Sequence, residues 1–249
     1  MKARYHRIPF VLALGAALAA PLRAAESAPS VDSILEKFVA ATGGKAALEK
    51  ITSRVIRGSL EAAGGPATTN WEMYAKAPNK QFSQAELTGM GTLMDGFDGA
   101  VAWAKNPYEG VRVKEGDELA KVKRDADFHR ELNFKTLHPG LAFKGTEKLD
   151  GDEVHVLESK PTASSLERFS FSAKTGLLVR NESEFTGQQG KMSVDIRSED
   201  FRVVDGVKYP YLLKIKINAG GQEFEFSIKI KELQHNVAIE DAKFAKPAS

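Results

Sequence analysis

The sequence predicts a mainly β fold of the α+β class, in which one large, strongly curved antiparallel sheet holds two or three helices against its concave side. Three observations support this prediction. Short runs with period-2 alternation recur between residues 54 and 234 of the 249-residue chain, separated by turns rich in Gly, Asn and Asp. Helical periodicity is confined to two stretches. The chain has no cysteine, so its stability must come from packing alone, which favours one continuous sheet.

The N-terminus has the pattern of a secretory signal peptide. Three basic residues precede an apolar run at residues 8–18, which is too short to span a membrane. We predict cleavage after Ala24, with Ala25 as the alternative end. An uncleaved anchor is disfavoured because Pro21 ends the run and Arg23 follows it. The predicted organisation is therefore a signal peptide at residues 1–24 and a single domain at residues 25–249, exported to the periplasm.

Signal removal changes the electrostatic interpretation. Residues 1–24 contain four basic groups and no acidic group, so the whole-chain charge of +2 becomes +2 − 4 = −2. The remaining charges of both signs are interspersed. This pattern gives no support to a nucleic-acid partner.

Three helices are expected. The first carries an apolar stripe at i, i+3, i+4, i+7 and i+8 from Val31 to Val39, and Gly43-Gly44 ends it. A short second helix runs from Lys45 to about Ile51. A third, charged helix spans Glu118 to Leu132. Its interleaved acidic and basic residues are typical of a solvated surface held by ion pairs.

The remaining elements are strands joined by hairpin turns, as in a meander. We expect about ten or eleven strands from thirteen candidate segments, with a Gly-rich break after Leu87. The predicted strand segments are Val55–Glu61, Asn70–Lys76, Gln81–Leu87, Ala100–Lys105, Val111–Lys114, Leu141–Lys148, Val154–Ser159, Glu167–Ala173, Leu177–Phe185, Met192–Asp200, Phe201–Val204, Lys208–Ile217 and Glu223–Gln234.

Three local patterns resemble the LolA/LolB lipoprotein-carrier superfamily. The first is the strand ending in Tyr74-Ala75-Lys76-Ala77-Pro78-Asn79. The second is Asp98-Gly99, three residues, Trp103, two residues and Asn106-Pro107. The third is the C-terminal Ile239-Glu240-Asp241-Ala242-Lys243-Phe244. The segment from Phe38 to Leu48 is similar to exported proteins described as outer-membrane lipoprotein-sorting proteins.

This resemblance implies a half-barrel of about eleven antiparallel strands, closed by helices, around an apolar cavity for acyl chains. It further implies a role in outer-membrane biogenesis. One departure concerns the Pro-Asn turn, where the lipoprotein carriers have an arginine immediately before the proline. This chain has Ala77 there, with Lys76 before it.

No catalytic, metal or cofactor site is expected. The histidines that remain after processing do not stand at metal-ligand spacing with a second ligand. The sequence has no nucleophile elbow, P-loop or dinucleotide fingerprint. An enzyme is therefore not predicted.

The leading hypothesis is a monomeric, non-catalytic periplasmic binder or carrier of lipid or lipidated protein. The alternative is a module on the same scaffold that senses or binds an envelope protein. Aromatic and Met side chains suit adaptable apolar binding, although they also suit an ordinary core. By alternation, Val101 and Trp103 share one face of their strand, which we expect to be the concave one, and Ala100, Ala102 and Ala104 share the other, where a helix can approach. The candidate cavity residues are Trp71, Met73, Phe82, Val101, Trp103 and Phe143.

Overall fold

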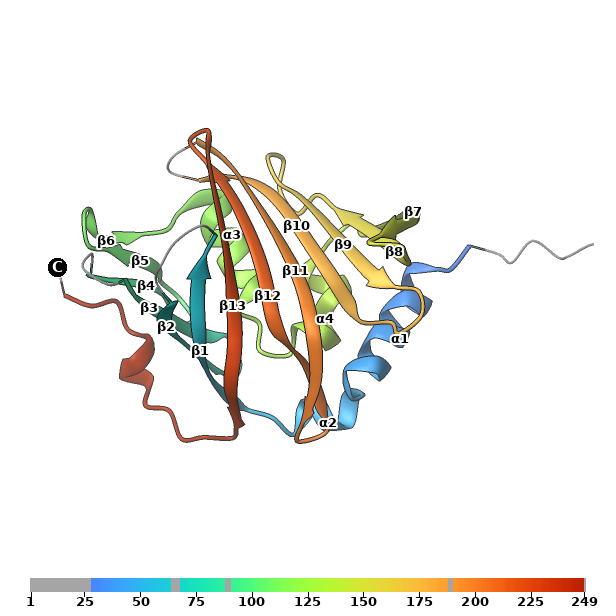
Figure 1. Cartoon of the computed structure of the whole chain (residues 1–249), viewed down its shortest axis with the longest axis horizontal. Coiled ribbons are helices and arrows are strands. Elements are labelled where there is room, and N and C mark those ends of the chain that lie inside the picture. The colour runs from blue at the N-terminus through green and yellow to red at the C-terminus, as the bar shows by residue number, and fades with distance from the viewer. Residues whose placement is uncertain (1–27, 64–67, 88–90, 188–189, 249) are drawn as a thin grey trace, which may run out of the picture.

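We analysed a computed structural model, which describes residues 28–63, 68–87, 91–187 and 190–248. These residues form one open antiparallel sheet of 13 strands, in the order β6-β5-β4-β3-β2-β1-β13-β12-β11-β10-β9-β8-β7 (Figure 1). The prediction of a mainly β, curved antiparallel sheet is confirmed, but the strand number is higher than about eleven. The predicted signal peptide lies outside the described residues.

The first half of the sheet contains β1 (Ser53–Ala62), β2 (Thr68–Lys76), β3 (Lys80–Leu87), β4 (Gly91–Phe97), β5 (Ala102–Asn106) and β6 (Gly110–Val113). The second half contains β7 (Ala142–Leu149), β8 (Asp152–Ser159), β9 (Leu166–Ser172), β10 (Leu178–Gly187), β11 (Gly190–Val204), β12 (Val207–Ala219) and β13 (Gln222–His235).

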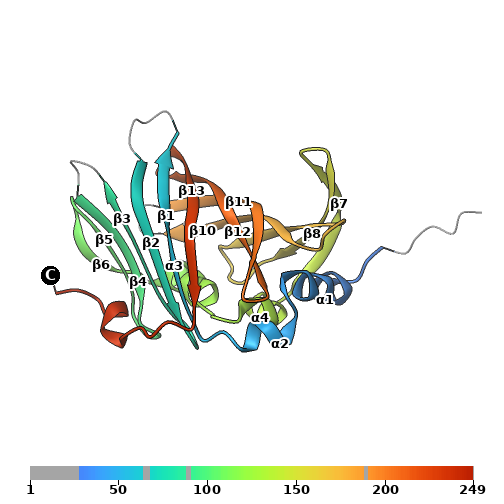
Figure 2. The ribbon, with the colours of Figure 1, turned by 60° about the horizontal axis from the view of Figure 1, so that its bottom comes forward.

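Two meanders, β1–β6 and β7–β13, meet where the first strand pairs with the last. Ile56 lies opposite Leu233, and Leu60 lies opposite Ile228. The chain crosses from β6 to β7 through two helices, which lie in the hollow of the curved sheet (Figure 2). We call the face that carries these helices the concave face and the opposite one the outer face.

The two N-terminal helices agree with prediction. They are α1 (Val31–Thr42), ended by Gly43 with a φ of 137°, and α2 (Lys45–Glu49). The predicted single helix over residues 118–132 is wrong, because the chain forms α3 (Gly116–Asp125) and α4 (Arg130–Leu137). Between them Phe128 is buried, and its amide donates to the carbonyl of Pro78 at 2.9 Å. A 3₁₀ helix, η1 (Asp241–Phe244), lies against β3. The described chain thus has more helices than the two or three predicted.

The Gly-rich break after Leu87 conceals a strand, β4. A Cβ added at Gly96 would lie 2.3 Å from the Trp103 indole, so glycine here allows a close approach within the sheet. A second difference is that β11 is continuous where two strands were predicted. It passes through Asp200, whose φ is 52°.

Each face of the sheet packs against a different element. On the concave face, one cluster joins β1, β12 and β13 to Leu48 and Phe128, and a second joins β8 and β9 to α1 and Phe134 of α4. On the outer face, Phe82 and Trp103 pack against Phe244 of the C-terminal segment. The sheet is therefore covered on both sides over β3–β5.

Candidate functional site

Five neighbouring strands, β2, β1, β13, β12 and β11, build an apolar surface on the concave face. Residues opposite each other in an antiparallel pair share a face. Two rows of apolar residues therefore cross the sheet on this face. One row consists of Leu60, Ile228 and Leu213. The other consists of Phe226, Ile215 and Ile196. The β1 residues on this face between Ile56 and Ala62 are uncharged. The residues paired with them in the neighbouring strands are uncharged too.

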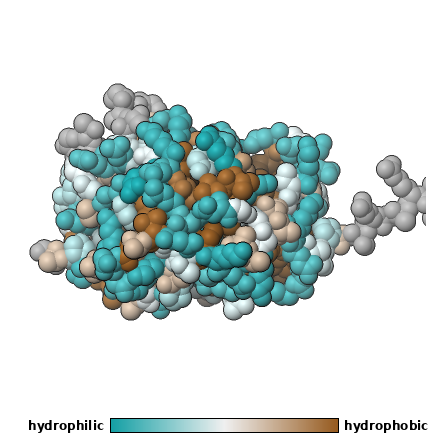
Figure 3. Space-filling view, turned by 90° about the horizontal axis from the view of Figure 1, so that it is seen from below, coloured by the Kyte–Doolittle hydropathy of each residue, from teal (hydrophilic) through white to brown (hydrophobic). Residues whose placement is uncertain are grey.

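Part of this surface is not filled by the helices. Eight of its apolar side chains pack against the buried cluster and yet stay only half-buried. We call them the concave patch: Leu60, Trp71, Met73, Val194, Ile196, Leu213, Ile217 and Phe226. A separate view from below, the side on which α2 lies, shows further apolar side chains in the middle of the surface, within a frame of hydrophilic ones (Figure 3). An accessible, charge-free apolar surface inside a curved sheet is the chemistry that an acyl chain requires.

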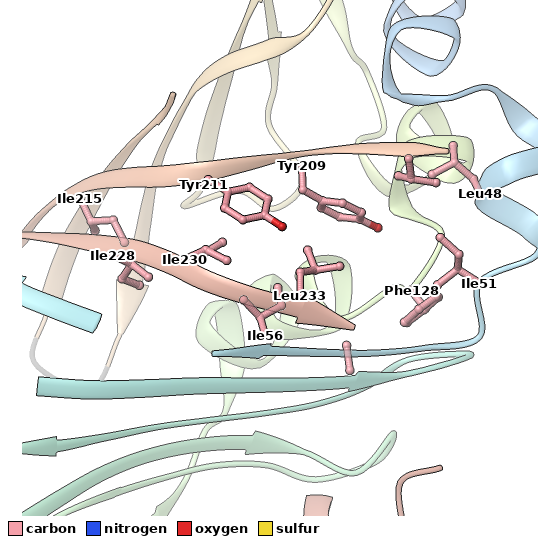
Figure 4. Close-up of a cluster of buried hydrophobic side chains, with 12 residues drawn as sticks. Leu48, Ile51, Ile56, Phe128, Tyr209, Tyr211, Ile215, Ile228, Ile230 and Leu233 are labelled. Atoms are coloured by element: carbon pink, nitrogen blue, oxygen red, sulfur yellow. The ribbon is translucent and has the colours of Figure 1, made fainter. Parts of the chain in front are cut away.

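The inner end of this surface is closed. Leu48, Ile51 and Phe128 cover it, and they lie beyond Tyr209 and Tyr211 (Figure 4). The hydroxyl groups of both tyrosines point toward this end. Burial raises the pKa of Tyr209 to about 12, so its phenol stays neutral.

Charged side chains fix the crossing helices to the sheet beside the patch. Arg124 of α3 donates to Glu167 Oε1 of β9 at 2.7 Å, and His138 Nδ1 lies 2.7 Å from the other carboxylate oxygen. Burial alone would raise the pKa of Glu167, but these contacts outweigh it and lower the pKa to about 2. Arg112 of β6 makes a bidentate contact to Glu118 of α3 at 2.7 and 2.8 Å.

The six predicted cavity residues do not come together. Trp71 and Met73 belong to the concave patch, and Phe143 shares this face but packs on the α1 and α4 cluster. Val101 stands in the β4–β5 turn and is 37 % exposed.

The prediction that Trp103 faces the concave interior is wrong. Its register partner Gly96 pairs in turn with Phe82, which places Trp103 and Phe82 together on the outer face. There Trp103 Nε1 donates to the carbonyl of Phe244 at 3.0 Å. The companion expectation is confirmed for Ala102, which lies on the other face and is buried against Ala126 at the end of α3, whereas Ala100 lies outside β5 and is exposed.

Most of the patch was not predicted from the sequence. Every second residue of β12 from Tyr209 to Ile217 is a large apolar or aromatic one, and Lys214 and Lys216 in between are exposed. This period-2 signal resembles the one in β13 and could have identified the strand as the floor of the site.

Two depressions are present among the described residues. One, of about 550 Å³, is lined mainly by charged side chains that alternate with the patch residues, among them Arg197, Lys214 and Glu225. The other, of about 230 Å³, lies between α1 and the strands that carry His155 and Phe171.

The described residues show neither a metal site nor a membrane-spanning helix. They contain no group of three or more His, Cys, Asp or Glu side chains able to hold a metal ion. None of the helices that the structure describes has the length and apolar character needed to cross a membrane.

Comparison with known proteins supports the fold. No family model and no curated protein matches the sequence. A DUF1329 family protein from Desulfovibrio piger superposes with a TM-score of 0.54 at 14 % identity, covering 88 % of this chain and 98 % of that one. A LolA superfamily protein from Nitrosomonas europaea gives 0.54 at 15 %, covering 88 % and 99 %.

A third solved structure, a putative outer membrane lipoprotein-sorting protein domain from Vibrio parahaemolyticus, gives a TM-score of 0.51 at 12 % identity, covering 78 % of this chain and 90 % of that one. At these identities the comparisons establish the fold alone. The resemblance inferred from the sequence is confirmed at that level, since the chain has a LolA-like fold.

Proposed function

We propose that this protein is a non-catalytic periplasmic binding or carrier protein for lipid or lipidated protein, and that it holds acyl chains on the concave patch. The mature protein is the single domain at residues 25–249, released by cleavage of the signal peptide at residues 1–24. One observation carries the proposal: five adjacent strands present a charge-free apolar surface that the helices of the same chain leave half-buried.

The energetics of apolar burial favour this assignment. Each methylene that leaves water contributes about 0.8 kcal/mol, so an acyl chain binds without covalent chemistry. Trp71 and Met73 offer large and adaptable contact area, and we assign both as ligand contacts. The LolA-like fold agrees with this role, because one of the solved neighbours is described as a lipoprotein-sorting domain.

Native mass spectrometry of gently purified mature protein, with displacement of a fluorescent fatty acid, tests the proposal. Two adjacent leucines supply a matched pair of variants. Leu213 lies on the concave patch, whereas Leu212 pairs with Lys229 and faces the outer side, and both are half-buried. Leu213→Asp should abolish dye binding, because it places a charge on the patch. Leu212→Asp should retain it.

A clean apo mass without dye displacement would remove the proposal. Equal loss of dye binding in the two variants would contradict the assignment of the ligand to the concave face. A stoichiometric envelope protein recovered without lipid would instead support the alternative of an interaction or sensing module.

A further inference from the structure

Arg54 lies at the inner end of the concave face, next to the patch. It precedes Ile56 on the same face of β1, and it is opposite Ala75 and His235 in the neighbouring strands. Its guanidinium carbon is 4.1 Å from the centre of the Tyr209 ring and 5.2 Å from that of Phe128. Nη2 donates to the Tyr209 hydroxyl. As a whole residue Arg54 is half-buried, so part of it stays accessible at this end of the concave face.

The charge of Arg54 lacks a close counter-ion. It forms no ion pair with any described carboxylate, and its Nε is buried without a hydrogen-bond partner among the described residues. Glu131 attracts it from a greater distance, and Arg130 opposes that attraction. Burial lowers the pKa of Arg54, yet an arginine stays protonated in proteins.

A second phenol lies next to Tyr209 on β12. Tyr211 is buried on the same face of β12 as Tyr209, and its hydroxyl makes no hydrogen bond to the described residues. In Figure 4 this hydroxyl points toward Tyr209, which itself bonds to Arg54. A guanidinium without a described counter-ion, near a phenol without a hydrogen-bond partner among the described residues, matches an acidic group. Arginine binds carboxylate and phosphate oxygens through its fork of N–H donors.

We propose that the site takes free single-chain acidic amphiphiles, with the carboxylate or phosphate head held at Arg54 and Tyr211 and the tail lying outward along the concave patch. This inference rests on the proposed function and narrows its ligand class. An acyl chain attached to a polypeptide has its head outside the protein and cannot enter in this orientation. A free acid enters head first.

The test compares the affinities of three ligands that have the same acyl or alkyl chain length and different head groups. Dodecanoate, dodecyl phosphate and methyl dodecanoate are titrated into the mature protein by displacement of a fluorescent probe at pH 7.5. We expect at least one of the acids to bind about tenfold tighter than the ester, the equivalent of one charge-assisted hydrogen bond. Arg54→Met should abolish this preference and leave ester affinity unchanged. The variant should fold, because an apolar side chain of similar length replaces a charge without an ion pair.

Two further variants complete the design. Arg202→Met is the matched control, because Arg202 stacks on Tyr211 at 4.4 Å but is exposed and paired bidentately with Asp200. It should keep the preference. Tyr211→Phe should weaken the preference for the acids over the ester. If Arg54→Met fails to fold, this variant alone tests the assignment of the head-group site.

The outcomes separate the two proposals. Equal affinity of the wild type for acids and ester, or an unchanged preference in Arg54→Met and Tyr211→Phe, overturns the head assignment while the acyl-binding function stands. Failure of all three compounds to bind overturns both.

Discussion

The indole ring of Trp103 occupies the space in which a side chain at Gly96 would stand. The two residues are opposite each other in β4 and β5, and an added Cβ at Gly96 would lie 2.3 Å from Trp103 Cε2 and 2.4 Å from Cζ2. The indole is 1 % exposed, and Phe82 and Phe244 pack against it. It therefore has little room to move away.

Gly96→Ala should lower the free energy of unfolding by about 1 to 3 kcal/mol, the usual range for overpacking a core. Urea unfolding measures the loss. In a Trp103→Ala background the same substitution should cost much less, because the clashing ring is gone. Equal costs in the two backgrounds would show that the penalty arises from the strand backbone and not from the indole.

This pair illustrates what the sequence can predict. Alternation along β5 correctly separated Trp103 from Ala102 and Ala104, because side chains in a strand point alternately to opposite faces. It did not reveal which face is concave. Both faces are covered here, one by the end of α3 and the other by the C-terminal segment. An apolar residue on either face therefore looks like a core residue in the sequence.

The break between α3 and α4 was likewise not visible in the sequence. No Gly or Pro stands between Asp125 and Arg130, so the local sequence permits a continuous helix. The tertiary contact of Phe128 with Pro78 and the concave cluster overrides that preference. The patch itself was only half predicted, since Trp71 and Met73 were identified but the residues of β11 and β12 were not.

Trp103→Ala should destabilise the protein by about 3 to 5 kcal/mol, as expected for truncation of a buried aromatic side chain. The fraction that remains folded should bind a fluorescent fatty acid with unchanged affinity, because Trp103 lies on the outer face. Thermal unfolding and dye titration on the same sample give both quantities. Weakened dye binding in fully folded protein would contradict the outer-face assignment.

Stability should depend on Glu167 in a defined pH range. Its folded-state pKa of about 2 lies below the ordinary glutamate value, so the unfolded chain takes up this proton first as the pH falls. The stabilisation is therefore complete above about pH 5 and is lost between about pH 5 and pH 2. A shift of this size corresponds to about 3 kcal/mol.

Wild type and Glu167→Gln should be compared by urea unfolding at pH 7, 5 and 3, because other carboxylates cancel in the difference. The wild-type advantage should be constant between pH 7 and 5 and smaller at pH 3. An advantage that does not change with pH would mean that Arg124 and His138 do not favour the charged carboxylate in the folded state.

Phe244→Ala should uncover the outer-face cluster. Phe244 is fully buried, and its carbonyl accepts the Trp103 Nε1 hydrogen bond. We expect a loss of about 3 to 5 kcal/mol in stability and a red shift in Trp103 emission as water reaches the indole. Phe224→Ala is the control, because that side chain is 50 % exposed; it should change neither property. A stable Phe244→Ala protein with unshifted emission would show that the C-terminal segment does not shield Trp103.

The two tryptophans of the chain offer a direct test of which face binds ligand, because they lie on opposite faces of the same sheet. Trp71 is half-buried on the concave patch, and Trp103 is enclosed on the outer face. Trp103→Phe leaves Trp71 as the single reporter, and its emission should shift to the blue when dodecanoate displaces water from the patch. Trp71→Phe leaves Trp103, whose emission should not respond. Both variants keep an aromatic ring in place, so folding can be confirmed by thermal unfolding before titration. A response from Trp103 with silence from Trp71 would move the ligand to the outer face and refute the concave patch as the binding surface.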